Sequence, residues 1–386
     1  MKKYTFALIA LITTLNLAAK DEFSVRLKNN KIITYPITEI DSIKEVADIG
    51  VKVYLKNNGK SVDFLSSQYT EINIPKQDKK SNKNANKVSR NAPYAWRIEY
   101  PALTHDNGNT LVITKIWNNT NRKRKEVNFS LEWDKSLKSN RWTCYYMYDG
   151  NSVTDYPVKR GNKFIEDENI PEKYRSKNSD FKGTAFDRGH LCPSADKPMD
   201  RQQNAQTFYL SNMAPQYWRH NQQLWQKMEE YVRSLNNSMF RDTLYIVKAA
   251  AIDKKNIATW EQTEIKPGMS FSNGRKATKK MNLPVSRHFY MAILCKKGNK
   301  YHAMALWVKH TNSEEYNKKR TFGDFAINIK KLEELTGIDF FCNLPDNIEK
   351  KVETEPVDLS FWGLKVTKGK KVGWEVYAPW PTDAFK

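Results

Sequence analysis

The sequence predicts an α+β fold in which a large domain follows a small β-rich module. Segments that alternate apolar and polar residues, as half-buried strands do, are mixed with helical segments, without the strand–helix–strand repeat of a doubly wound sheet. A basic stretch with almost no apolar residues separates the module from the domain. With 39% apolar and 12% aromatic residues, the 386-residue chain can bury a core, so a wholly disordered or collagen-like protein is excluded.

The N-terminus has the layout of a cleavable secretory signal, which we assign to residues 1–19. Two lysines precede a mostly apolar segment over residues 6–17, and the small residues Ala18 and Ala19 follow it. The apolar segment is shorter than the roughly 18 residues that a membrane span needs. We therefore expect an exported protein, periplasmic or extracellular, without integral membrane contact.

Residues 21–75 are predicted to form the β-rich module. Residues 23–27 and 51–55 alternate apolar and polar side chains with the period of a strand. Asparagine-rich turns at residues 29–30 and 57–59 follow these runs, which favours two similar hairpins. The module contains no catalytic pattern, and an additional adhesive role would lie here.

Residues 76–92 are predicted to be a flexible basic linker. They contain six basic residues, one acidic residue and almost nothing apolar. Such a segment buries too little surface to fold alone. We favour a solvated tether over a segment that contacts a polyanion, and the large domain then spans residues 93–386.

The large domain is dense in aromatic and β-branched residues, which favour strands. Strands are predicted at residues 110–117, 141–148, 243–247, 289–294 and 301–307, and helices at residues 221–235 and 328–335. Gly337 follows the second helix, where glycine is typical of a left-handed C-terminal cap. An aromatic tail is predicted to close the core as a hairpin around residues 368–369, with Trp362, Trp374 and Trp380.

The four cysteines are Cys144, Cys192, Cys295 and Cys342. They are widely spaced and form no CxxC pair, which disfavours a zinc knuckle or a thioredoxin-like site. In an oxidising compartment they allow three disulfide pairings, and their spacing does not select one. The alternative is that some of them are small buried side chains.

The formal net charge is +21, from 64 Lys and Arg against 43 Asp and Glu. A cationic surface of this size attracts polyanions, including nucleic acid, acidic membranes and acidic glycans. Charge alone does not choose among these partners.

One of the six histidines lies in an unusual setting, directly after Asp187, Arg188 and Gly189. This motif places a titratable base, His190, beside a guanidinium that suits phosphate. The glycine allows a sharp turn or the close approach of a ligand. Because a single histidine is more often structural, the motif needs support from other residues.

Two further groups of polar residues follow the motif. Asn212 lies in a Leu-Ser-Asn-Met-Ala-Pro-Gln segment, and Asn221, Trp225 and Glu229 are spaced four residues apart. That spacing puts all three on one face of a helix. Taken singly, Asn221 could be an N-terminal cap and Glu229 a surface charge. Together and in this order, the groups indicate a catalytic site.

The three motifs resemble those of the DNA/RNA non-specific endonuclease family, which includes endonuclease G. That family combines Asp-Arg-Gly-His, Asn-x-x-Pro-Gln and Asn-x-x-x-Trp-x-x-x-Glu. The resemblance covers roughly residues 93–353 and includes a C-terminal block over residues 325–352. It implies a ββα-metal (His-Me finger) nuclease core with a mixed or antiparallel sheet.

The resemblance also implies catalytic roles. His190 would be the general base that deprotonates the attacking water, since its ordinary pKa of about 6.5 leaves it mostly neutral near pH 7. Asn221 would be the direct protein ligand of Mg²⁺, or of another divalent cation such as Mn²⁺. Arg188 would bind the phosphate and stabilise the transition state, and Asp187 would be structural.

Other residues would support this site. Glu229 would orient waters around the metal, and Asn212 would stabilise the site by hydrogen bonding. The family carries a further upstream arginine at the phosphate, and either Arg160 or Lys163 could serve here. Residues 249–251 are alanines where the family tends to carry glycine, which leaves the loop geometry there open.

We therefore predict an exported, metal-dependent endonuclease that hydrolyses phosphodiester bonds in DNA and RNA. Contacts to phosphate carry no base information, so little sequence specificity is expected. The charge of +21 fits the capture of nucleic acid. The alternative is a non-catalytic module that binds nucleic acid or another polyanion with the same fold. The preference between DNA and RNA, the oligomeric state and an inhibitor partner are left open.

Overall fold

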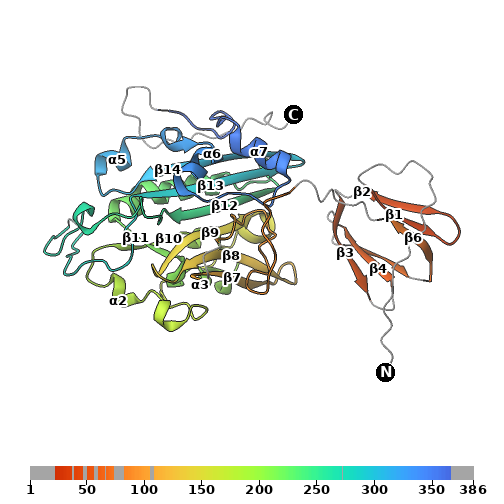
Figure 1. Ribbon diagram of the computed structural model, residues 1–386, viewed down its shortest axis with the longest axis horizontal. Coiled ribbons are helices and arrows are strands. Elements are labelled where there is room, and N and C mark those ends of the chain that lie inside the picture. Colours follow the sequence, from red (N-terminus) through yellow and green to blue (C-terminus); the bar gives the residue numbers. More distant parts are fainter. Residues whose placement is uncertain are drawn as a thin grey trace. The chain divides into compact units, whose positions relative to one another are not determined.

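The computed structural model describes residues 22–36, 39–46, 50–55, 60–65, 67–73, 82–104, 108–271 and 273–366. The chain divides into two compact units, Met1–Lys80 and Ser81–Lys386 (Figure 1). Within the described ranges, no helix is both long and apolar enough to cross a membrane. The predicted secretory signal lies outside these ranges.

The first unit contains two antiparallel three-stranded sheets, ordered β2-β1-β6 and β3-β4-β5. Its strands are β1 (Glu22–Leu27), β2 (Ile32–Pro36), β3 (Ile40–Val46), β4 (Gly50–Leu55), β5 (Ser61–Leu65) and β6 (Tyr69–Asn73). Alternate side chains, including Phe23, Val25 and Val53, are buried in a small core. The strands predicted from alternation at residues 23–27 and 51–55 are β1 and β4, and the predicted turn at residues 57–59 lies outside the described residues.

The second unit is built on a seven-stranded antiparallel sheet with the order β15-β14-β13-β12-β9-β8-β7. Its strands are β7 (Thr110–Asn119), β8 (Arg124–Asp134), β9 (Ser139–Met147), β12 (Thr243–Ala250), β13 (His288–Lys297), β14 (Lys300–Lys309) and β15 (Ala326–Ile327). All five predicted strands lie in this sheet, whereas β8 and β15 were not predicted. The α+β fold with an antiparallel sheet is confirmed.

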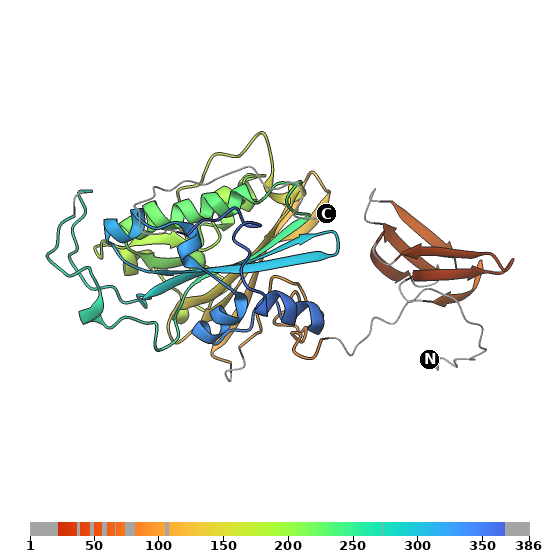
Figure 2. The same ribbon diagram turned by 90° about the horizontal axis from the view of Figure 1, so that it is seen from above.

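The two faces of this sheet support two separate hydrophobic cores. On β12, Leu244 and Ile246 point into one core, and Val247 and Ala249 point into the other, as the period of a strand requires. Helix α4 (Gln226–Ser234) covers the first face, while α6 (Ile329–Thr336) and α7 (Asp346–Thr354) pack on the second (Figure 2). The site described below lies on the α4 side.

The remaining elements are short. They are α1 (Asp149–Ser152), η2 (Glu172–Tyr174), α2 (Asn178–Phe181), β10 (Asp187–His190), η3 (Ser194–Asp196), α3 (Arg201–Gln206), η4 (Leu210–Asn212), β11 (Met213–Gln216), η5 (His220–Trp225), η6 (Trp260–Gln262), α5 (Glu314–Lys318) and η7 (Phe322–Phe325). The label η marks 3₁₀ helices, except that η5 is a π-helix. The second predicted helix is α6. Asn328 caps its N-terminus by accepting a hydrogen bond from the Lys331 amide, and Gly337 ends it with a φ of 71°.

Residues 82–92 belong to the second unit, which corrects our prediction of a flexible linker over residues 76–92. The Asn82 side chain donates to the Leu344 carbonyl at 2.7 Å, and Asn84 donates to Glu349 at 2.8 Å. Asn86 donates to the Pro101 carbonyl at 2.9 Å. Composition misled the prediction because asparagine amides, rather than apolar side chains, fix this segment. Residues 76–81 lie outside the described residues.

All four cysteines are free thiols in buried positions. Cys192 and Cys295 pack in the core on the α4 side of the sheet, and Cys144 packs in the core on the other side. They act as small buried side chains, so the structure supports this alternative over disulfide pairing. In the predicted aromatic tail, Trp362 is buried, whereas Trp374 and Trp380 lie outside the described residues.

Candidate active site

Two short strands and the helix that follows them carry the motif residues. β10 pairs antiparallel with β11, so that Gly189 lies opposite Ala214 and His190 opposite Met213. A Cβ atom on Gly189 would clash with the fully buried side chain of Gln216, so any larger residue would force that side chain to move. The glycine of the motif therefore allows the strand pairing that presents Arg188 and His190.

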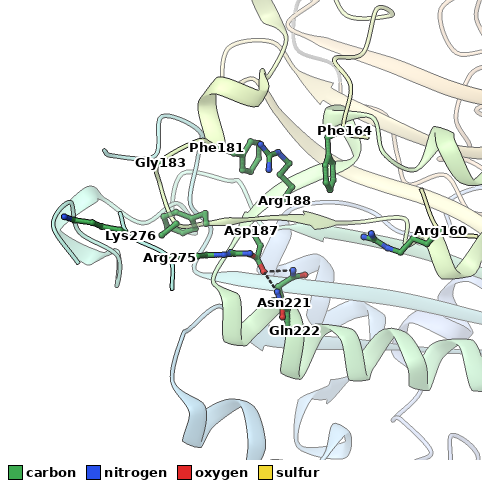
Figure 3. Close-up of a pocket in the computed structure, with 12 residues that line it drawn as sticks. Arg160, Phe164, Phe181, Gly183, Asp187, Arg188, Asn221, Gln222, Arg275 and Lys276 are labelled. Carbon is green, nitrogen blue, oxygen red and sulfur yellow. Dashed lines mark hydrogen bonds and ion pairs between the residues drawn. The ribbon is translucent and has the colours of Figure 1, made fainter. Parts of the chain in front are cut away.

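Two adjoining cavities open on this ββα unit. The first has a volume of about 470 Å³ and the second about 520 Å³. Arg160, Arg188, Asn221 and Gln222 line both cavities. Figure 3 shows the residues that line the first. We call the second the catalytic cavity, because His190, Glu229, Glu230 and Arg233 line it, and the first the flanking cavity.

His190 ends β10 with its ring against two phenyl rings. The centroid distances are 5.8 Å to Phe164 and 4.9 Å to Phe208. The Trp225 indole donates to the His190 carbonyl at 3.2 Å, which ties the strand to the helix. Nε2 is buried and has no hydrogen-bond partner among the described residues. Burial, together with the charge of Arg160, lowers the pKa of His190 to about 3, so the imidazole is neutral at pH 7.

Two arginines bring positive charge to both cavities. The Arg188 guanidinium lies between the rings of Phe164 and Phe181, 5.2 and 5.4 Å from their centroids (Figure 3). Its Nε is buried and unpaired among the described residues. Of the two predicted upstream phosphate ligands, Arg160 lines both cavities, whereas Lys163 is exposed and lines neither.

Asp187 holds the side-chain amide of Asn221. Its Oδ2 accepts hydrogen bonds from Nδ2 of Asn221 at 2.8 Å and from Nε2 of Gln222 at 3.3 Å (Figure 3). Its Oδ1 accepts a hydrogen bond from the Arg275 guanidinium. Because Nδ2 is engaged, the amide oxygen of Asn221 is the atom left for a cation. The structural role predicted for Asp187 is therefore the orientation of Asn221.

Asn221 lies in a π-helix, η5, which continues directly into α4. It is inside the helix rather than at its N-terminal cap, which is Arg219, so the interpretation as a capping residue is wrong. Single π-turns within helices are frequent at functional sites because the wider turn displaces side chains. Asn221 and Glu229 line the same cavity, although the sequence indicated a regular α-helix between them.

Glu229 faces the catalytic cavity in front of a buried ammonium. Its side chain is 13% exposed, and its Oε1 lies 3.9 Å from Nζ of Lys248 on β12. Lys248 is fully buried, and its Nζ has no hydrogen-bond partner among the described residues. Burial raises the pKa of Glu229 to about 7, although the charge of Lys248 opposes this shift. The surface-charge interpretation of Glu229 is therefore wrong.

Asp196 shares the Lys248 ammonium, with Oδ2 3.9 Å from Nζ. It also accepts hydrogen bonds from the Tyr145 hydroxyl at 2.7 Å and from Nε of Arg233 at 2.8 Å. Burial alone would raise the pKa of Asp196, but Arg233 and Lys248 outweigh it and lower that pKa. This network was not predicted from the sequence. The one local sign of it is that Lys248 is the only charged residue of β12.

Asn212 supports the chain just beyond His190. Its Oδ1 accepts from the Cys192 amide at 2.9 Å, and its Nδ2 donates to the carbonyls of Cys192 at 2.8 Å and Thr207 at 2.9 Å. The side chain is fully buried and lines neither cavity. Asn212 is therefore a positioning residue that acts through the backbone.

A separate group of carboxylates lies near the C-terminal helices. Oxygen atoms of Glu333, Asp339 and Glu353 all lie within 4.8 Å of one another. None of the three lines the catalytic or the flanking cavity. This group is therefore no part of the site built on β10, β11 and η5.

Comparison with known proteins gives a family match over the second unit. Residues 107–347 match the sequence model of the DNA/RNA non-specific endonucleases. Human "Nuclease EXOG, mitochondrial" is 27% identical over 224 residues, which are 56% of this chain and 56% of that protein. "Nuclease C1" of Cunninghamella echinulata is 28% identical over 210 residues, which are 53% of this chain and 76% of that protein.

Among solved structures, a chain from the crystal structure of the EndoG/EndoGI complex matches with a TM-score of 0.45 and 21% identity. The match covers 57% of this chain and 86% of that one. The chain spans 56–59% of the length of the EXOG proteins that it matches from human, Xenopus laevis and Danio rerio.

Proposed function

Since this chain belongs to the DNA/RNA non-specific endonuclease family, we propose that it hydrolyses phosphodiester bonds within DNA and RNA with the help of a divalent metal ion. The observation that carries the proposal is the catalytic cavity, where a neutral His190 lies beside Arg188, Arg160 and the oriented amide of Asn221. These groups supply a base, two cations for phosphate and an oxygen ligand for a cation.

His190 is the proposed general base that takes a proton from the attacking water. A pKa of about 3 keeps the ring neutral but makes it a weak base. A phosphodiester anion bound at Arg160 would offset part of the charge that lowers this pKa. Substrate binding therefore raises the basicity of His190 when the reaction requires it.

Arg188 and Arg160 are the proposed phosphate ligands. The phenyl rings on both sides of Arg188 fix its guanidinium before substrate binds, so little side-chain entropy is lost on binding. Its unpaired Nε then gains a partner. Fixed donors that meet developing negative charge stabilise the transition state. Because these residues contact phosphate rather than bases, little sequence specificity is expected.

The residues present fit a hard divalent cation such as Mg²⁺. Asn221 and Glu229 both line the catalytic cavity, and both side chains offer oxygen donors. One direct protein ligand suits Mg²⁺, which retains most of its own waters. When bound, the metal supplies neutralisation of charge on the phosphate and the leaving oxygen. Asp187 then orients the Asn221 amide, and Lys248 balances the charge of the Glu229 carboxylate.

Export of the chain is also a proposal, supported by the order of charged, apolar and small residues over residues 1–19. Edman sequencing of protein recovered outside the cytoplasm would give the mature N-terminus. We expect a start close to Lys20, and recovery of the intact chain only from the cytoplasm would contradict export.

Incubation of a supercoiled plasmid and of a long RNA with the full chain, in Mg²⁺ and in EDTA, tests the activity. We expect nicked and then fragmented products in Mg²⁺, no cleavage in EDTA and at least a 100-fold slower reaction for His190→Ala. Retarded but intact nucleic acid under both conditions would instead favour the alternative, a polyanion-binding module with a nuclease fold.

A further inference from the structure

The flanking cavity opens beside the catalytic cavity, and two of the residues that line only it, Arg275 and Lys276, make no contact with phosphate or metal in the proposed chemistry. Its own wall comes from two segments distant in sequence. Residues 181–186 precede β10, and Arg275 and Lys276 lie on a loop that connects β12 to β13 (Figure 3). Arg160 and Arg188 form the boundary with the catalytic cavity.

The loop carries Arg275 and Lys276 on an arm with fixed geometry. Within the arm, the Gly268 amide donates to the Ala277 carbonyl at 2.8 Å, and the Phe271 amide donates to the Arg275 carbonyl at 2.9 Å. At its base, the Thr278 amide donates to the Gly183 carbonyl at 2.7 Å. The arm is therefore attached to the opposite wall of the cavity and holds its two cations there.

The charge of the flanking cavity is strongly positive. Arg160, Arg188, Arg275 and Lys276 line it together with one carboxylate, Asp187, and that carboxylate is already paired with Arg275. The Arg275 side chain is 40% exposed, so donors beyond the one used for Asp187 can reach an anion. Lys276 is exposed. Such a surface binds an anion rather than a metal ion or an apolar ligand.

The flanking cavity also offers an aromatic surface at the boundary. The half-buried Phe164 ring lies 5.2 Å from the Arg188 guanidinium and 5.8 Å from the His190 ring, so it borders both the phosphate ligand and the base. Rings of this kind stack on nucleobases without regard to sequence. The volume of about 470 Å³ is within the range of sites that enclose a small organic ligand.

We propose that the flanking cavity binds the nucleotide next to the cleaved bond, with its phosphate at Arg275 and Lys276 and its base against Phe164. This inference rests on the proposed function, because the neighbouring cavity must hold the cleaved phosphate. Along each strand of B-form DNA the phosphates recur about every 3.4 Å of helix axis, so a strand in the catalytic cavity must present its next phosphate close by. The arm thus extends recognition beyond the cleaved phosphodiester.

Oligonucleotide binding by the full chain in a His190→Ala background tests the site without cleavage. Fluorescence anisotropy with a labelled poly-dT 12-mer over a salt series gives the slope of log K against log salt. Removal of one phosphate contact to a single strand should reduce that slope by about 0.7. We expect this reduction for Lys276→Ala, and Lys254→Ala is the matched control, because Lys254 is an exposed cation of the same loop that lines neither cavity.

The possible outcomes separate the two proposals. A reduced slope for Lys276→Ala with an unchanged slope for Lys254→Ala supports the flanking site, even if the plasmid assay shows no cleavage. Equal slopes for Lys276→Ala and the parent overturn the flanking site and leave the proposed cleavage standing. Equal reductions in both variants also overturn it, because binding would then follow net charge rather than this cavity.

Discussion

Replacing Lys248 with methionine should shift the pH dependence of cleavage. Lys248 is fully buried, and its ammonium lies 3.9 Å from the Glu229 carboxylate, which faces the catalytic cavity. Methionine retains much of the volume and removes the charge. The charged groups around Glu229 are then Asp196, which raises its pKa further, and Arg233, which lowers it.

The size of the shift follows from the distance. At 3.9 Å and an effective dielectric constant of about 20, one ammonium stabilises one carboxylate by about 4 kcal/mol. That energy corresponds to about 3 pKa units. Glu229 is 13% exposed, and water will enter near the new side chain, so we expect a shift of about 1–2 units. The direction is upward, because the negative form of Glu229 loses a favourable partner.

The pH profile of kcat/KM reports this shift, because it follows the ionisation of the free enzyme. The pKa of Glu229 is about 7 before a metal ion binds, so at a Mg²⁺ concentration well below saturation activity should rise through neutral pH as the carboxylate ionises. His190 contributes no rise there, since its pKa of about 3 leaves it neutral throughout that range. In Lys248→Met the same rise should begin about 1–2 pH units higher.

Lys197→Met is the control. Lys197 is also fully buried, and its Nζ has no hydrogen-bond partner among the described residues. Both lysines lie over the Tyr145 ring, Lys197 at 4.9 Å and Lys248 at 5.6 Å from its centroid. Lys197 has no ion pair with Glu229 among the described contacts. Both variants replace one buried lysine with an apolar side chain of similar size, but only Lys248→Met should move the pH profile. An unchanged profile for a folded Lys248→Met would refute this account of Glu229.

Three further predictions follow from the described contacts. His190→Ala should retain its fold and its affinity for nucleic acid but lose about 10²–10⁴ in kcat; near-normal cleavage would remove His190 as the base. Arg160→Gln should raise the pKa of His190, measured by NMR titration of the imidazole, yet leave it below about 6.5 because burial remains; a lowered pKa would contradict the assigned cause. A chain that starts at residue 93 should melt at a lower temperature than one that starts at residue 81. The shorter chain loses the Asn82, Asn84 and Asn86 hydrogen bonds, each worth about 1 kcal/mol. Equal melting temperatures would show that this segment contributes nothing to stability.

The segment over residues 82–92 shows what composition could not predict. Composition placed the domain boundary after residue 92, because a basic stretch without apolar residues resembles a linker. Asn82 instead hydrogen bonds to a carbonyl 262 residues away, on a surface whose shape exists only in the folded chain. Side-chain amides can fix a segment as firmly as apolar contacts, and their partners leave no local pattern.

The helix that carries Asn221 shows another limit. Four-residue spacing correctly placed Asn221 and Glu229 at one cavity, because both π- and α-turns bring such residues to neighbouring positions. The spacing could not reveal the π-turn itself. At the start of this helix, His220 contacts Phe289 on β13 and His310 just after β14, and the spacing of residues 221–229 carries no sign of these contacts.

Sequence alone determined the features whose cause is local. The alternation of apolar and polar residues predicted the strands at residues 23–27 and 51–55, and glycine at position 337 predicted a left-handed cap, which its φ of 71° confirms. Only the tertiary structure decided which distant charges complete the site. Arg275 pairs with Asp187 across 88 residues, and Lys248 meets Glu229 from a neighbouring strand. Such pairs form because folding brings residues that are distant in the sequence together, and in the Lys248–Glu229 pair low exposure makes the two charges interact more strongly than they would in water.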